Sequence, residues 1–185
     1  FMFVILGRSE LFTEHTTLAV IPVLDGQASF EQLGRLWGLV YVGNLVGGLL
    51  FTLLVILLMP ELGVVDPQSF ETIALKLVDH DLPWLFIGGV FAGWLMGLLA
   101  WLVTAAQDTT ARILLVLIVT GTIGLLHLPH SIAGNVEVLF GLIVSDAITL
   151  PDYSGFLVLA TIGNAFGGGV FVALLKYGHV VRGAN

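Results

Sequence analysis

His130 is the residue of this sequence whose chemistry stands out, because it lies between two apolar runs. The runs, 113–126 and 132–144, are separated by the segment HLPHS. A titratable side chain inside an otherwise apolar region is costly and usually marks a path for ions or protons. Histidine also changes its charge near neutral pH. We therefore predict that His130 lies on such a path and couples permeation to protonation. The alternative is a histidine that only satisfies the interrupted backbone.

Two polar residues, Ser131 and Asn135, follow His130 at the start of the second run. The free N–H groups at a helix N-terminus favour anions, and hydroxyl and amide groups are further hydrogen-bond donors. We expect Ser131 and Asn135 to add donors for an anion beside His130.

A second interruption lies near the start of the chain. The apolar run 1–6 stops at the segment GRSE, and the run 17–24 follows only after Glu14 and His15. Interrupted runs among whole ones are typical of discontinuous transmembrane helices, whose irregular backbone lines a cavity. The sequence therefore predicts two broken helices with a path between them.

The side chains of this first interruption have different expected roles. Because a carboxylate would repel an anion, we expect Glu10 to bind backbone N–H groups or Arg8 and so to hold the shape of the loop. Thr13 can offer its hydroxyl to an anion. Leu11 and Phe12 can form an apolar constriction that gates by dewetting.

Other chemistries are not supported by the sequence. There is no cysteine, and no carboxylate completes a known metal-ligand spacing with His127 and His130 or with His15. Ser131 adjoins His130 without the motif that surrounds a nucleophilic serine. We predict neither a metal nor a cofactor, and no enzymatic activity.

The composition indicates that lipid surrounds these segments. Only 10% of the residues are charged and the mean hydropathy is +1.04, whereas soluble domains contain about 25% charged residues. The runs 36–59, 84–103 and 156–175 are each long enough to span a bilayer. The net charge of −7 argues against nucleic-acid binding. Because the chain begins inside an apolar run, we expect 1–185 to be one transmembrane domain that lacks its N-terminal part.

The basic residues predict the orientation of the chain. If successive spans alternate sides, Arg35, Arg112, Lys176 and Arg182 fall on one side and Lys76 falls on the other. Basic residues concentrate on the cytoplasmic side. We expect a multi-pass protein of the plasma (inner) membrane with a cytoplasmic C-terminus.

An internal repeat relates two parts of the chain. The segment LVYVGNLVGGLLFTLLV (39–55) aligns with LATIGNAFGGGVFVALL (159–175) at an offset of 120 residues, which places Glu10 opposite His130. The repeat predicts inverted halves, approximately 1–59 (incomplete) and 82–180. Glycines at this spacing favour close helix packing. Because an unpaired amide in lipid is costly, we expect Asn44 and Asn164 to bond to the broken segments of the other layer.

Four motifs in this order resemble those of the formate/nitrite transporter family. They are GRSELFTEHTTL, GRLWGLVYVGNLVGGLLF, HSIAGN and TIGNAFGGGVF. The resemblance implies an aquaporin-like fold and a homopentamer with one pore in each subunit. It also implies transport of weak-acid anions such as formate or nitrite, which cross the apolar constrictions together with a proton.

The resemblance also assigns roles by position. His130 matches the central pore histidine, Thr13 the loop threonine and Leu11 the cytoplasmic constriction. Ile123 takes the place of an aromatic residue at the periplasmic constriction, and Lys76 that of the lysine before the fourth helix.

The chain departs from the family pattern at three places. Pro129 stands where Glu is common, Asn135 is shifted by one position, and Gly93 replaces an asparagine. Two alternatives remain open. One is a neutral-solute channel, although the Asn-Pro-Ala motifs of that family are absent. The other is a non-conducting scaffold or sensor, which Ile123 and Gly93 would suit if they deform the pathway.

Overall fold

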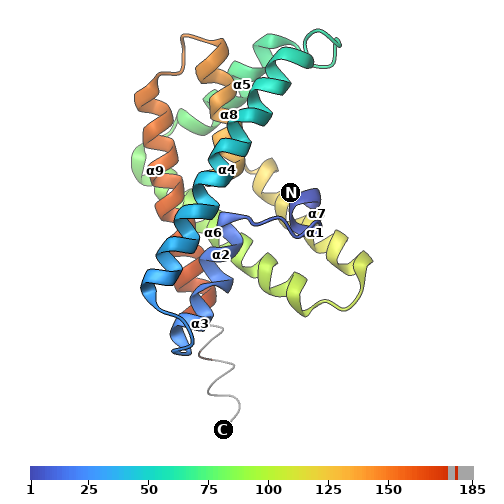
Figure 1. Cartoon of the computed structure of the whole chain (residues 1–185). Helices are drawn as coiled ribbons and strands as arrows, with labels where there is room; N and C mark the ends of the chain where they lie inside the picture. Colours follow the sequence, from blue (N-terminus) through green and yellow to red (C-terminus); the bar gives the residue numbers. More distant parts are fainter. Residues whose placement is uncertain (175–177, 179–185) are drawn as a thin grey trace.

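The computed structural model is helical in the part of the chain that it describes, residues 1–174 and 178 (Figure 1). The elements are α1 (Met2–Leu6), α2 (Phe12–Leu18), α3 (Val20–Leu24), α4 (Phe30–Leu58), α5 (Pro67–Val78), α6 (Leu82–Ala105), α7 (Thr109–Leu125), α8 (Ser131–Val144), α9 (Leu150–Phe166) and the π-helical segment η1 (Gly167–Leu174). The all-α class predicted from the sequence is confirmed for these residues.

Two helices, α4 and α6, are long and apolar enough to cross a membrane. The 24 residues of α6 rise about 36 Å, which exceeds the roughly 30 Å of a bilayer's hydrocarbon core. A capping box between Ser29 and Gln32 begins α4. The third predicted run corresponds to α9 continued by η1, and its last residue, 175, lies outside the described residues.

The long helix α4 carries an apolar surface. It runs the length of the molecule (Figure 1) and packs against α8. Most of its large apolar side chains are exposed, among them Leu39, Val42, Val46, Leu50 and Leu54. Exposed to water, a patch of this size would be an aggregation site. Lipid or a neighbouring copy of the chain can cover it, which fits a multi-pass membrane protein.

Both predicted interruptions are present. The first separates α1 from α2, and the second separates α7 from α8. Each contains a non-glycine residue with positive φ, Arg8 at 55° and His127 at 48°, a region that few L-residues occupy. The chain therefore turns sharply inside each broken helix.

The glycine motif of the repeat has a different role in each half. In α9 and η1, Gly163 and Gly167 lie directly against the backbone of α6, whereas Gly43 and Gly47 of α4 have no atom within 4 Å of where a Cβ would stand. Close packing is therefore confirmed for the second half within the described chain. On α4, Gly43 and Gly47 face an open surface, whereas Gly48 packs against Asn135 and Val136 of α8.

Gly93 of α6 is part of this tight packing. A Cβ at this position would overlap the backbone of Asn164, so the helices approach too closely for any side chain here. Close packing of α6 against Asn164 therefore explains why position 93 is a glycine.

Candidate functional site

His130 stands at the N-cap of α8 in extended backbone, with φ of −103° and ψ of 117°. Its Nδ1 accepts hydrogen bonds from the backbone N–H groups of Ile132 and Ala133, at 3.3 and 3.1 Å. The side chain is 1% exposed. Because Nδ1 acts as the acceptor, the neutral ring carries its proton on Nε2.

The other ring nitrogen links the two interruptions. His130 Nε2 lies 3.0 Å from Oγ1 of Thr13, a fully buried residue in the first turn of α2. With the proton on Nε2, the histidine donates and the threonine oxygen accepts, which leaves the hydroxyl hydrogen of Thr13 for another acceptor. The two residues singled out from the sequence are thus in direct contact, although they are 117 positions apart.

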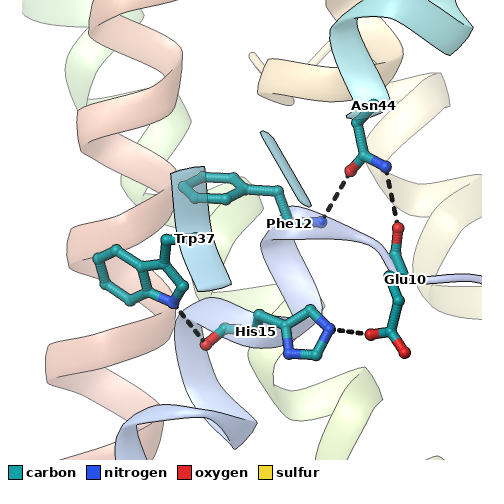
Figure 2. Close-up of polar contacts among 5 residues, drawn as sticks. All are labelled: Glu10, Phe12, His15, Trp37 and Asn44. Atoms are coloured by element: carbon teal, nitrogen blue, oxygen red, sulfur yellow. Dashed lines mark hydrogen bonds and ion pairs between the residues drawn. The ribbon is translucent and has the colours of Figure 1, made fainter. Parts of the chain in front are cut away.

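Asn44 of α4 holds the first interruption in place (Figure 2). Its Oδ1 accepts a hydrogen bond from Phe12 N at 2.9 Å, and its Nδ2 donates to the carbonyl oxygen of Glu10 at 2.9 Å. These bonds satisfy two backbone groups that the broken helix leaves unpaired.

Asn164 of α9 does the same for the second interruption. Its Oδ1 accepts from Ser131 N at 2.7 Å, and its Nδ2 donates to the carbonyl oxygens of Pro129 and Gly89, at 2.9 and 2.8 Å. The predicted bonds from the asparagines to the broken segments are confirmed. Each asparagine, however, binds the interruption of its own half, so the expected pairing with the other layer is wrong.

The predicted partners of the Glu10 carboxylate are wrong. That carboxylate contacts Nε2 of His15 (Figure 2), and the side chain is 66% exposed. The first turns of α2 bring His15 back toward Glu10, whereas Arg8 lies in a separate cavity of about 320 Å³ that Arg112 also lines. Glu10 still takes part in the loop's shape, through its backbone carbonyl.

Leu11 and Phe12 point to different surroundings. Leu11 belongs to a buried apolar cluster that also contains Ile123 and Met96, so the residues expected at the two constrictions share one cluster. The ring of Phe12 instead packs edge-on against Trp37 and Tyr41 of α4, with centroids 5.9 and 4.9 Å apart. Phe12 does not line the cavity at His130.

A small cavity of about 30 Å³ adjoins His130. This volume holds about one or two water molecules. The residues that line it are Phe1, Leu77, Ile123, Gly124, His127, Leu128, His130, Ala133, Gly134 and Glu137.

Asn135 is not among these residues. Its Oδ1 accepts from the hydroxyl of Tyr153 at 2.7 Å, and its Nδ2 lies against Gly48 of α4. Ser131 also stays outside the cavity. The reason is helical geometry: residues 131 and 135 share one face of α8, while 130, 134 and 137 share another.

Lys76 lies in a larger cavity of about 600 Å³ together with Asp79, His80 and His127. His127 lines both this cavity and the small one at His130. His127 and Glu137 were not predicted at the site from the sequence. The spacing of Glu137, seven residues after His130 on one helix, is the signal that could have found it.

The chain is similar to known proteins over most of its length. A model of the formate/nitrite transporter family matches residues 1–178. The chain is 29% identical to the inner membrane protein YfdC of Escherichia coli, covering 97% of this chain and 58% of that protein. It is 31% identical to the nitrite transporter NirC of Salmonella typhimurium, covering 92% of this chain and 64% of that protein. The chain thus spans about six tenths of the length of these relatives.

Two solved structures are similar. An FNT family ion channel matches with a TM-score of 0.82 and 28% identity, covering 95% of this chain and 71% of that one. A pentameric formate channel with formate bound matches with a TM-score of 0.77 and 22% identity, covering 97% and 78%. The second likeness concerns the fold alone.

Proposed function

Because this chain belongs to the formate/nitrite transporter family, we propose that the protein conducts small monovalent anions of weak acids, such as formate or nitrite, across the inner membrane. The path runs between the two broken helices and past His130. NirC, which is named a nitrite transporter, and the solved formate channel support this choice of cargo.

The observation that carries the proposal is the buried contact between His130 and Thr13. It lies where the two interruptions meet, and its polar groups are donors: a ring N–H and a hydroxyl whose hydrogen is free. Hydrogen-bond donors of this kind favour an anion over a cation. The apolar cluster around Leu11 and Ile123 favours the neutral acid. An anion entering these surroundings binds a proton more readily than it does in water.

Charging His130 requires a local rearrangement. Nδ1 accepts two backbone N–H groups, so a proton can bind there only if the first turn of α8 releases the ring. Protonation and movement of the path are therefore coupled. The small volume beside His130 also requires movement before an anion can pass.

The assembly and orientation belong to the same proposal. The exposed apolar face of α4 and the pentameric neighbour support a homopentamer in the bilayer. Arg35 lies near the start of α4, Arg112 near the start of α7 and Lys76 in the last turn of α5, as in the alternation of spans from which the orientation was predicted. This favours a cytoplasmic C-terminus, although Lys176 and Arg182 lie outside the described residues.

Uptake by the whole protein in liposomes tests the proposal. Formate and nitrite are offered at about pH 5 and about pH 8, on either side of the usual titration of histidine. We expect selective uptake that depends on pH. His130→Asn keeps an N-cap acceptor for α8 but removes the titratable ring, and it is expected to weaken the pH dependence.

Two outcomes would contradict the proposal. An unchanged pH profile in His130→Asn would remove the histidine from the mechanism. If a folded pentamer transported neither anion, a non-conducting scaffold or sensor would be favoured, a reading that the small cavity at His130 also fits.

A further inference from the structure

Glu137 lies on the face of α8 that carries His130. Residues 130, 133, 134 and 137 all line the small cavity, which is the spacing of one helix face. Seven residues of α-helix place Glu137 about 10 Å from His130 along the axis. The cavity at the central histidine therefore contains a carboxyl group.

Within residues 1–174, the structure gives Glu137 no hydrogen bond and no ion pair, and its side chain is half-buried. A carboxylate at membrane depth usually has a partner, or else it functions on a pathway. The Glu10 carboxylate, in contrast, contacts His15, and the carboxylate of Glu71 accepts a hydrogen bond from Ser145.

His127 connects Glu137 to the larger cavity. It lines the small cavity with Glu137 and the larger one with Lys76. A solute that moved from the larger cavity to His130 by way of this shared residue would pass Glu137, which lines the small cavity as well. On an anion path, a charged Glu137 would stand at the entrance to the central site.

We propose that Glu137 is a proton-binding carboxyl on this entrance, which admits anions when it is protonated and repels them when it is charged. The inference rests on the proposed function, because it takes an anion as the cargo. It assigns a second group, besides His130, through which pH controls permeation.

Among the described residues that line the small cavity, Glu137 is the acidic residue. That cavity also holds His127 and His130, and the larger one holds Lys76, Asp79 and His80. From α9, the hydroxyl of Tyr153 is bonded to Asn135. The part of α4 that contacts α8 is uncharged, at Gly48 and Thr52. Glu14 of α2 is absent from both cavities.

The test compares Glu137→Gln with the wild-type protein in liposomes. The amide keeps the shape of the side chain and removes its proton equilibrium. Formate uptake is measured from about pH 5 to about pH 8, and the ratio of mutant to wild-type uptake is taken at each pH. The ratio cancels the titration of formate itself and of His130.

We expect a ratio near one at low pH that rises to about tenfold at high pH, which corresponds to about 1.4 kcal/mol of repulsion removed. Glu137→Asp, which keeps the charge, should behave as the wild-type protein does. Glu61→Gln is the matched control, because this exposed residue lies outside both cavities. Its ratio should stay near one at every pH.

The outcomes separate the inference from the proposed function. If the wild-type protein transports formate and the Glu137→Gln ratio does not change with pH, the inference is wrong and the proposed function stands. If wild-type pentamers transport no anion, both are wrong. Size-exclusion chromatography of each variant before reconstitution shows that the compared proteins are assembled.

Discussion

Arg8 and His127, 119 residues apart, adopt the same left-handed backbone conformation, with φ of 55° and 48°. Asn44 binds Glu10 and Phe12 just after the first of these turns, and Asn164 binds Pro129 and Ser131 just after the second. The interruptions are therefore equivalent at an offset of 119, one fewer than the offset of the long helices.

The corrected offset changes the equivalences in the site. Leu11 corresponds to His130, and Glu10 corresponds to Pro129. Outside the interruptions the offset of 120 persists: Tyr41 and Thr161 occupy the same place in the two halves and share a hydrogen bond of 2.7 Å. The two halves thus meet at equivalent positions, as expected near a pseudo-two-fold axis.

The first prediction concerns Asn164→Ala. This substitution leaves Ser131 N and the carbonyl oxygens of Pro129 and Gly89 without their partner. Each unsatisfied buried group costs about 1–3 kcal/mol. We expect a clear fall in the thermal unfolding temperature of the pentamer in detergent, measured by circular dichroism.

Asn44→Ala is the matched comparison for this prediction. Asn44 makes two of these bonds rather than three, at positions that are less buried. We expect a smaller fall in the unfolding temperature. Equal falls in the two variants would contradict the inference that the hydrogen bonds of Asn164 stabilise the fold more than those of Asn44.

A second prediction concerns the packing of α6 on α9. In Gly93→Ala the new methyl group meets the backbone of Asn164, which cannot move aside as a flexible side chain can. Overpacking of this kind costs about 1–3 kcal/mol, so the variant should unfold at a lower temperature. It should also lose formate uptake, because Asn164 holds the backbone next to His130.

Gly121→Ala is the control for Gly93→Ala. This exposed helical glycine of α7 has no atom within 4 Å of where a Cβ would stand. Alanine in place of glycine in an open helix stabilises it by about 0.4–1 kcal/mol. A Gly93→Ala protein as stable as Gly121→Ala would show that the two helices can separate without penalty.

The sequence predicted the larger features of the fold because they depend on residue type and period. Apolar runs of sufficient length gave the spans, and the glycine-asparagine motif gave the repeat. The single-residue shift at the interruptions was not predictable, because Arg8 and His127 share no chemistry and are equivalent only in φ. The environment of Glu10 was missed for a related reason: its partner, His15, depends on the direction in which α2 leaves the loop.

The sequence predicted the site residues that stand out by residue type. It did not predict those whose position depends on which face of a helix they occupy. His130 and Thr13 were identified from their polar character within the two interruptions, and they are in contact. Asn135 was placed on the path because it follows the histidine closely in sequence. On a helix, however, a residue five positions on points to another side, and Glu137, farther along the chain, lines the cavity instead.

The last prediction tests the contact that carries the proposed function. Thr13→Val replaces the hydroxyl with a methyl group of similar volume, so Nε2 of His130 loses its acceptor and the path loses a donor. Removing one donor from a site that stabilises negative charge typically reduces the rate by about 100-fold. We expect a reduction of this order in formate uptake by Thr13→Val, while Thr13→Ser, which keeps the hydroxyl, retains most of the wild-type rate. Full uptake by a correctly assembled Thr13→Val pentamer would mean that the contact is structural and that the anion passes elsewhere.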